Sequence, residues 1–353
     1  MLKNISRPVL AGMMFRKEQQ PQSPQPSKIE NVETRIFQNS GVEYTSKMIP
    51  IRFHNSEMYT VSIEAKEKSD ENVVLIHGFA AGVATWARVI PDMTKTHNVH
   101  AFDLLGFGRS SRPPFSSDPA IAELEMVEAI EDWRKKMNLQ NIIIVAHSFG
   151  AYLASSYALE HPTHVKHMVL VDPWGFAEKV ETTEKQIKPY SWMSVVASIA
   201  GRFNPLGLVR LMGPYAPYVT AKLRPDLQAR FPSSRPNDIY KYIALLNQQR
   251  PTGEEAFMNM TQPIGWAKRP MVKRFGGIDE NVPATFIYGG KSWIDPAPAI
   301  LLRGEGKRYV DIQIVTGAGH QVFADDPEAF NGIVRNVLDG NLVDDESSDT
   351  CCP

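Results

Sequence analysis

The fold of this chain is decided by the stretch Ile142-Ile143-Ile144-Val145-Ala146-His147-Ser148-Phe149-Gly150. Its first four residues are all apolar, which is typical of a central parallel strand that helices cover on both faces. A helical pattern follows and runs through 157–160. A serine between such a strand and such a helix lies on a sharp turn, where small flanking residues let the two backbones approach. We therefore expect the Ser148 hydroxyl to be a nucleophile; the alternative is a serine that caps the helix.

Short apolar runs on either side of this stretch alternate with helical patterns, which indicates parallel βαβ units. The expected strands are residues 73–76, 99–102, 142–145, 168–171, 285–288 and 312–315, and residues 43–53 and 57–64 are expected as an antiparallel hairpin. Apolar residues recur every third or fourth position from Ile121 to Met137 and predict an amphipathic helix. The sequence thus predicts an α/β fold with one mostly parallel central sheet flanked by helices.

The chain has 353 residues, which is more than this core requires. Residues 173–282 contain helical patches punctuated by proline and glycine without a convincing strand, so we expect an inserted helical cap. Residues 18–30 are rich in Gln, Pro and Ser, so residues 1–32 are expected as a flexible arm and linker. The folded domain is expected over 33–340, followed by an acidic disordered tail over 341–353.

The composition excludes several classes of protein. A hydrophobic fraction of 43% argues against a disordered chain, and a net charge of −1 argues against a nucleic-acid partner. Cys351 and Cys352 are adjacent, so no disulfide bridges the core and a reducing compartment fits. The apolar runs fall short of the roughly 18 to 20 residues of a membrane span, so we expect any membrane association to be peripheral. We expect no cofactor and no metal site, and three clustered histidines are expected at the surface: His161, His164 and His167.

A serine nucleophile needs a base, and the base needs an orienting carboxylate. His320 follows both the Ser148 turn and the last expected strand, on a glycine-rich loop. Asp172 and Asp295 each follow a strand, at the edge of the sheet where catalytic groups collect. We favour Asp295, because it has the usual place in the chain order Ser, acid, His, while Asp172 would anchor the turn into the cap.

Catalysis by such a serine also requires amide donors for the negative charge that develops on the attacked carbonyl oxygen. The amide of Phe149, directly after the nucleophile, is one expected donor. The second is expected from the loop His77-Gly78-Phe79-Ala80-Ala81-Gly82, with the Phe79 amide as the favoured group.

Several longer strings carry a resemblance to a known family. They are residues 102–113, Pro173-Trp174-Gly175-Phe176, residues 265–271, and Gly319-His320 followed by Ala324-Asp325 and Phe330-Asn331. With them, residues from about 40 to 340 resemble α/β-hydrolase-fold proteins of the group that contains the lipid-droplet lipase co-activator and the lyso-N-acylphosphatidylethanolamine lipase. The resemblance implies an α/β-hydrolase fold and a role in glycerolipid or phospholipid metabolism at a lipid surface.

The chain departs from this group in two respects. Co-activator members commonly have Asn at the nucleophile position, whereas this chain has Ser148. Co-activators also carry a Trp-rich N-terminal droplet anchor, and no Trp precedes Trp86 here. The basic, partly apolar N-terminal arm, or acylation of Cys351 and Cys352, would substitute for that anchor; plain tail thiols are the alternative.

The resemblance further implies an acyltransferase motif of His, four residues and an acid, which here is His320 to Asp325. In that interpretation His320 deprotonates an acceptor hydroxyl such as that of a lysophospholipid. Alternatively, Asp325 or Asp326 caps the last helix, because Pro327 and Glu328 follow. Hydrolysis and acyl transfer both fit an acyl-Ser148 intermediate.

The predicted function is a serine hydrolase or acyltransferase acting on lysophospholipids, phospholipids or acylglycerols. We expect the protein in the cytoplasm, bound peripherally to lipid droplets. The alternative location is the mitochondrion, to which the basic N-terminal arm would direct it. A second hypothesis, from the resemblance, is an adaptor that recruits a triglyceride lipase to droplets; a third is an esterase for small soluble esters. Apolar residues of the cap are expected to line an acyl tunnel, to enter a lipid surface, or to pack onto the sheet: Trp192, Met193, Val195, Val196 and Ile199, then Leu206, Leu208, Val209, Leu211 and Met212.

Overall fold

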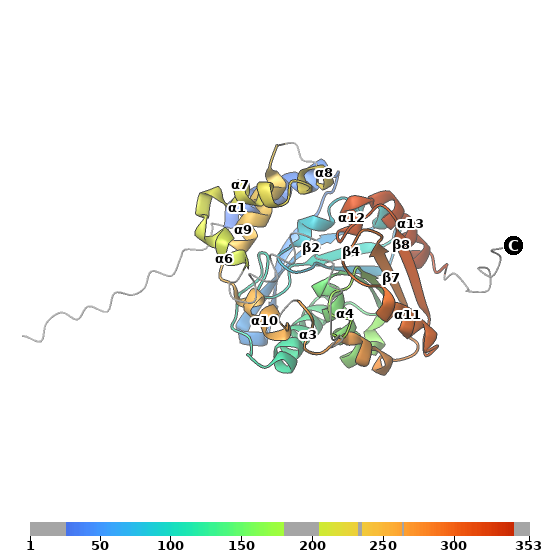
Figure 1. Ribbon diagram of the computed structural model, residues 1–353. Coiled ribbons are helices and arrows are strands. Elements are labelled where there is room, and N and C mark those ends of the chain that lie inside the picture. Colours follow the sequence, from blue (N-terminus) through green and yellow to red (C-terminus); the bar gives the residue numbers. More distant parts are fainter. Residues whose placement is uncertain (1–25, 180–204, 232–234, 263–264, 342–353) are drawn as a thin grey trace, which may run out of the picture.

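The computed structural model describes residues 26–179, 205–231, 235–262 and 265–341. Within them, eight strands form one sheet in the order β1-β2-β4-β3-β5-β6-β7-β8 (Figure 1). The strands are β1 (Thr45–Ile51), β2 (Ser56–Ile63), β3 (Asn72–Ile76), β4 (Asn98–Phe102), β5 (Ile142–His147), β6 (Val165–Val171), β7 (Ala284–Gly289) and β8 (Val310–Val315). β1 and β2 pair antiparallel, β2 pairs antiparallel with β4, and the remaining pairs are parallel. The predicted mostly parallel sheet with an antiparallel edge is confirmed.

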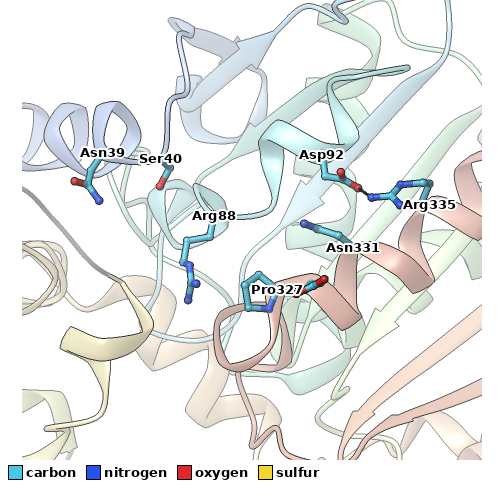
Figure 2. A pocket seen from close by; sticks show the side chains of 8 residues that line it. Asn39, Ser40, Arg88, Asp92, Pro327, Asn331 and Arg335 are labelled. Carbon is cyan, nitrogen blue, oxygen red and sulfur yellow. Dashed lines mark hydrogen bonds and ion pairs between the residues drawn. The ribbon is translucent and has the colours of Figure 1, made fainter.

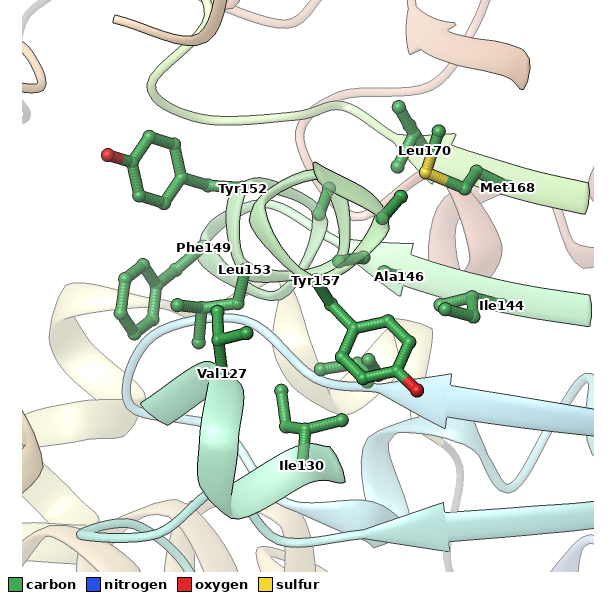
Figure 3. Packing of buried hydrophobic residues seen from close by; sticks show 14 of the residues in the cluster. Val127, Ile130, Ile144, Ala146, Phe149, Tyr152, Leu153, Tyr157, Met168 and Leu170 are labelled. Carbon is green, nitrogen blue, oxygen red and sulfur yellow. The ribbon is translucent and has the colours of Figure 1, made fainter. Parts of the chain in front are cut away.

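Helices cover both faces of this sheet, and β5 shows why its sequence is continuously apolar. Ile142 and Ile144 pack in a cluster with α3 (Pro119–Lys136) and α4 (Phe149–Glu160). Figure 3 shows side chains of α3, α4, β5 and β6 meeting there. Ile143 and Val145 belong to the cluster on the opposite face, because successive strand residues point to opposite sides. That cluster also contains side chains of α2 (Ile90–Met93), α12 (Val322–Asp325) and α13 (Pro327–Leu338), while α11 (Ala297–Gly304) contributes to the first.

The N-terminal boundary of the fold differs from the prediction. Residues 26–32 were expected in a flexible linker, but α1 (Pro26–Asn39) begins seven residues earlier than the expected domain start. Ile29, Val32 and Ile36 on this helix are buried in the core, together with Phe37. Their spacing of three and four residues is a helical signal, which outweighs the Gln- and Pro-rich composition just before it.

A buried carboxylate fixes α1 to the rest of the molecule. Glu33 is fully buried and accepts hydrogen bonds from the Tyr59 hydroxyl (2.6 Å), from Arg109 Nη1 (2.8 Å) and from the Tyr242 hydroxyl (3.3 Å). The Arg109 guanidinium also stacks 3.9 Å from the centre of the Tyr59 ring. Because Tyr59 lies on β2 and Tyr242 on α9 (Asp238–Asn247), Glu33 links the N-terminal helix to the sheet and to a helix of the cap.

The Glu33 contacts predict a pH dependence of stability. Burial and the nearby Asp103 carboxylate raise the pKa of Glu33 to about 7, from an ordinary value of 4.5. Between these pH values the folded chain keeps a proton that the unfolded chain loses, so the free energy of unfolding falls as pH rises. In urea unfolding between about pH 5 and pH 7, the wild type is expected to lose on the order of 2 kcal/mol more stability than Glu33→Gln. Parallel pH profiles of the two proteins would contradict this assignment.

The described part of the expected cap is helical. It contains α6 (Pro205–Leu211), α7 (Ala216–Leu223), α8 (Leu227–Arg230), α9 and α10 (Thr252–Met260), and an isolated bridge between Thr261 and Ala267. Figure 1 shows α6, α7 and α9 gathered beside α1 at one end of the molecule. Within residues 271–282, Met271, Phe275, Ile278 and Val282 pack into the α3–α4 cluster of the core. In the part of the chain that the structure describes, no helix combines the length and apolar character needed to cross a bilayer.

Several predicted features lie outside the described residues. They are the basic arm before residue 26, the acidic tail with Cys351 and Cys352, and the apolar cap residues Trp192, Met193, Val195, Val196 and Ile199.

Candidate active site

Ser148 lies on the turn between β5 and α4 in a conformation that side chains rarely adopt. Its φ is 52° and its ψ is −115°, so the backbone is strained as at other functional turns. The Ser148 amide donates to the Val171 carbonyl at 3.0 Å, which ties the turn to β6. A Cβ at Gly150 would lie 2.5 Å from the carbonyl oxygen of His77, so only glycine permits this approach of α4 to β3. The turn predicted from the sequence is therefore present.

His320 brings Ser148 and an aspartate together. Its Nε2 lies 3.0 Å from Ser148 Oγ, and its Nδ1 lies 2.5 Å from Asp172 Oδ2. With the Nδ1 proton donated to Asp172, Nε2 is free to accept the serine proton. The Asp172 side chain is fully buried, whereas 28% of the His320 side chain is exposed. The imidazole thus joins a buried carboxylate to a hydroxyl at the edge of solvent.

The structure contradicts the choice of Asp295 as the orienting acid. Asp295 is exposed, and its Oδ1 accepts the Ala297 amide at 2.9 Å at the start of α11. Asp172 instead contacts His320 and also accepts hydrogen bonds from the Gly289 amide (3.2 Å) and from the Ser292 hydroxyl. Because β6 and β7 are neighbours, both aspartates follow strands at the same edge, and chain order alone does not separate them. The contact from Ser292, on the loop that carries Asp295, was not predicted from the sequence.

Two further histidines hold the backbone around the site. His147 Nε2 donates to the His320 carbonyl at 2.8 Å, and burial, followed by the neighbouring His320, holds the pKa of His147 well below its ordinary value. A neutral His147 therefore donates without adding charge. His77 Nδ1 donates to the Gly78 carbonyl at 2.7 Å, and its Nε2 accepts the Leu104 amide at 3.0 Å. Neither residue has a role predicted from the sequence; their positions directly before Ser148 and after a strand were the available signal.

The two segments expected to supply the amide donors meet at Ser148. A Cβ at Gly78 would lie 3.1 Å from the Ser148 Cβ, so the loop that carries Phe79 passes directly beside the serine. Phe149 is the first residue of α4, and the first amides of a helix have no carbonyl partner within it. The rings of Phe79 and Phe149 both pack on Phe257, at centroid distances of 4.4 and 4.9 Å.

A cluster of aromatic rings packs beside the serine turn. The Trp174 ring packs 4.7 Å from Phe257 and 6.0 Å from Phe149, and the Trp174 amide donates to the Ser148 carbonyl at 3.2 Å. The Trp174 indole donates to the Gly265 carbonyl at 2.6 Å, which orients the ring. The cluster joins Phe149 after β5, Trp174 after β6 and Phe257 on α10, and Phe149 and Trp174 are buried within it.

The two acids near His320 have different roles in the structure. Asp326 caps α13 by accepting the Ala329 amide at 3.0 Å. Asp325 accepts the Gly319 amide at 2.8 Å and forms an ion pair with Arg230. Its contact with the histidine loop is therefore through the backbone before His320. The acyltransferase role of His320 and Asp325 stays a prediction.

The clustered histidines are not grouped as metal ligands. Within the described ranges, no group of three or more His, Cys, Asp or Glu side chains is arranged to hold a metal ion. His161 and His164 are half-buried, and His161 Nε2 lies 3.0 Å from Glu128 Oε1. The expectation of a surface position is wrong for His167, which is buried on β6 with Nε2 2.9 Å from Thr285 Oγ1. Burial lowers the pKa of His167 to about 4, so it is neutral in the sheet.

Residues 71–327 match the family model described as "alpha/beta hydrolase fold". The chain belongs to this family. Among the relatives of this alpha/beta hydrolase, abhydrolase domain-containing protein lid-1 of Caenorhabditis elegans is 57% identical over 91% of each chain. The human (lyso)-N-acylphosphatidylethanolamine lipase is 38% identical over 89% of this chain and 92% of its own. The mouse 1-acylglycerol-3-phosphate O-acyltransferase ABHD5 is 39% identical over 84% of this chain and 85% of its own.

Solved structures agree on the fold of this alpha/beta hydrolase. A bacterial membrane phospholipase A superposes with a TM-score of 0.65 at 20% identity, covering 89% of this chain and 91% of that one. Carboxylesterase CesB from Bacillus subtilis superposes with a TM-score of 0.64 at 16% identity, covering 89% and 98% of the two chains. The predicted fold class and family are confirmed.

Proposed function

We propose that this alpha/beta hydrolase is a lipid-acting serine acyl hydrolase or acyltransferase, with Ser148, His320 and Asp172 as its catalytic residues. The observation that carries the proposal is the hydrogen-bonded chain from Ser148 Oγ through the His320 ring to Asp172. A hydroxyl, a base and an orienting carboxylate in this order are the requirements of acyl transfer through a covalent intermediate.

The reaction begins when Ser148 Oγ attacks the acyl carbonyl carbon and His320 Nε2 takes the hydroxyl proton. Asp172 stabilises the imidazolium that forms, and the amides of Phe79 and Phe149 donate to the oxyanion. The tetrahedral intermediate then collapses, the bond to the leaving alcohol breaks, and His320 returns the proton to that alcohol. An acyl-Ser148 ester remains.

The second half of the reaction decides between hydrolysis and transfer. His320 removes a proton from an incoming water or lipid hydroxyl, whose oxygen attacks the acyl-Ser148 carbonyl. The bond between the acyl carbon and Ser148 Oγ then breaks, and His320 returns the proton to Ser148 Oγ. Water yields a free fatty acid, and a lysophospholipid or acylglycerol hydroxyl yields a new ester. The same three side chains support both outcomes.

The proposed substrates are lysophospholipids, phospholipids or acylglycerols. The partly buried rings of Phe79 and Phe257, whose centroids lie 4.4 Å apart, support an apolar acyl group near the loop that passes the serine. The names of relatives support the same class, since they include a (lyso)-N-acylphosphatidylethanolamine lipase and a 1-acylglycerol-3-phosphate O-acyltransferase.

The cap supports a peripheral location on a lipid surface such as that of a droplet. Leu211, Tyr215, Tyr218 and Leu223 are 63 to 82% exposed, which is unusual for such large apolar side chains. Lys222 Nζ lies 4.9 Å from the Tyr218 ring, which adds a cation to the same stretch. Aromatic and aliphatic side chains combined with lysine are typical of segments that lie at a membrane interface.

Liposome flotation tests this location. The triple variant Tyr215→Ser, Tyr218→Ser and Leu223→Ser is expected to lower partitioning onto phosphatidylcholine–phosphatidylserine vesicles by at least about 10-fold. Each replacement removes apolar side-chain area that the wild-type protein would bury in the lipid. The matched control is Ile300→Ser with Leu301→Ser on α11, whose side chains are 50 and 64% exposed. An equal loss in the control would indicate that exposed apolar area in general, and not this face, causes binding.

Replacement of Ser148 by Ala tests the catalytic proposal. We expect release of fatty acid from lysophospholipid to fall by at least about 10³-fold, since the nucleophile is lost while the fold is kept. Normal hydrolysis by the variant, with an unchanged circular dichroism spectrum, would exclude Ser148 as the nucleophile. The Ser148→Ala variant is also expressed in cells that lack the protein, and lipid-droplet turnover is measured. Full rescue of turnover by this variant would favour the alternative function, a co-activator that recruits a triglyceride lipase.

A further inference from the structure

One carboxylate joins the cap to the loop that carries the proposed base. Asp325 Oδ1 is ion-paired with Nε of Arg230, the last residue of the cap helix α8. Asp325 Oδ2 accepts the amide of Gly319 at 2.8 Å, and Gly319 directly precedes His320. The side chains of Arg230 and Asp325 are 21 and 13% exposed, so their attraction is screened less than that of a surface pair. The cap and the base are therefore linked through Asp325.

Arg88 makes a second link between the same two segments. Its Nη1 donates to the Arg230 carbonyl at 2.7 Å and to the Ala324 carbonyl at 2.8 Å. Figure 2 shows Arg88 on the wall of a surface pocket of about 410 Å³, with Asp92 and Arg335 on another side of it. Two contacts thus hold the end of α8 against α12. The Arg88 guanidinium binds a backbone carbonyl of each helix, and the side chains of Arg230 and Asp325 form an ion pair.

The backbone around His320 is held from two sides. Its own carbonyl accepts His147 Nε2 at 2.8 Å, a contact from the central strand. The preceding amide, that of Gly319, is bound by Asp325, a contact that depends on the short helix α12. This helix turns the chain back, so that the fifth residue after His320 reaches the residue before it. The spacing of four residues between His320 and Asp325 is therefore the one that lets the Asp325 side chain reach the Gly319 amide.

We propose that Asp325 is a positioning residue, which sets His320 against Ser148 only while Arg230 of the cap is docked on it. The inference rests on the proposed function of Ser148 and His320. Displacement of a reacting group by about 1 Å costs on the order of 100-fold in rate. A cap that shifts away from Asp325 therefore slows both halves of the reaction equally, because the same base serves hydrolysis and transfer.

Kinetics of single and double variants test the coupling. Arg230→Gln and Asp325→Ala are each expected to lower kcat on lysophospholipid by about 10-fold or more with KM changed less than about 3-fold, and the double variant should resemble Asp325→Ala. Acyl transfer to a lipid acceptor should fall by the same factor as hydrolysis. The control is Arg335→Gln, which removes an ion pair with Asp92 beside the same pocket and should leave both rates unchanged. Additive effects of the two replacements would overturn the proposal, and so would loss of acyl transfer alone in Asp325→Ala.

Amide hydrogen exchange gives a readout that needs no activity. In the Ser148→Ala background, Arg230→Gln is expected to increase exchange of the Gly319 amide by about 10-fold or more, while amides of β5 stay protected. Unchanged exchange at Gly319 would overturn the coupling even if Ser148 is catalytic. Conversely, increased exchange together with hydrolysis that survives in Ser148→Ala would refute the proposed function and leave the coupling between cap and loop intact.

Discussion

Asp172→Asn is expected to lower kcat for ester hydrolysis by about 10⁴-fold, the size of effect seen when a triad aspartate becomes an amide. The amide cannot stabilise the imidazolium, and its NH₂ group facing Nδ1 favours the wrong tautomer of His320. The buried contacts of Asp172 with Gly289 and Ser292 make the position sensitive to the change in charge. Hydrolysis of a lysophospholipid measured under saturating substrate gives kcat directly.

Asp295→Asn is the matched comparison. Both aspartates follow strands at the same end of the sheet. Asp295, however, is exposed, and its side chain accepts the Ala297 amide at the start of α11. Because asparagine also caps helix starts, this variant is expected to keep kcat within about 3-fold of wild type. The opposite ranking, with Asp295→Asn the more damaging change, would restore the assignment made from chain order.

Gly150→Val is expected to destabilise the protein by about 3 kcal/mol, because the added side chain meets backbone atoms, which cannot move aside as a side chain can. A Cβ there would lie 2.5 Å from the His77 carbonyl oxygen and 2.6 Å from that of Ile76. Relief requires α4 to move away from β3, which also separates Ser148 from the Phe79 loop. Urea unfolding followed by circular dichroism measures the loss.

Gly332→Ala is the control for glycine replacement inside a helix. Gly332 lies in α13, and a Cβ there would meet no atom within 4 Å. Alanine is expected to stabilise this helix by about 0.5 to 1 kcal/mol, through its lower conformational entropy in the unfolded chain. If Gly332→Ala destabilised the protein, the space available for an added Cβ would not be what decides the effect of replacing a glycine in this fold.

The order of elements and the position of the turn that carries Ser148 could be predicted because both are local signals. The apolar run from Ile142 to Val145 marks a strand buried on both faces, and Ser148 with Gly150 marks the turn after it. The hairpin and the helix over Ile121 to Met137 also follow from periodicity within one segment. Each of these inferences needs only residues that are neighbours in sequence.

The choice of acid could not be predicted by the same means. Asp172 and Asp295 occupy equivalent places in a pattern of strand followed by acid, and their geometry relative to His320 depends on how β6, β7 and β8 pair. The burial of Glu33 and the contact of Asp325 with Arg230 likewise join segments far apart in the chain. Such contacts arise from tertiary packing, and a single sequence does not show which distant segments come into contact.

The pairing of Ser148 with His320 spans 172 residues and has a consequence for biosynthesis. The proposed nucleophile follows the central strand β5, whereas the proposed base follows β8, an edge strand that is the last of the described strands in the chain. A nascent chain that has emerged only as far as β7 holds a serine with no partner for its proton. With the proposed catalytic residues, ester cleavage is therefore expected to begin only when the C-terminal helices have been translated and packed, and a chain terminated before β8 is expected to be inactive.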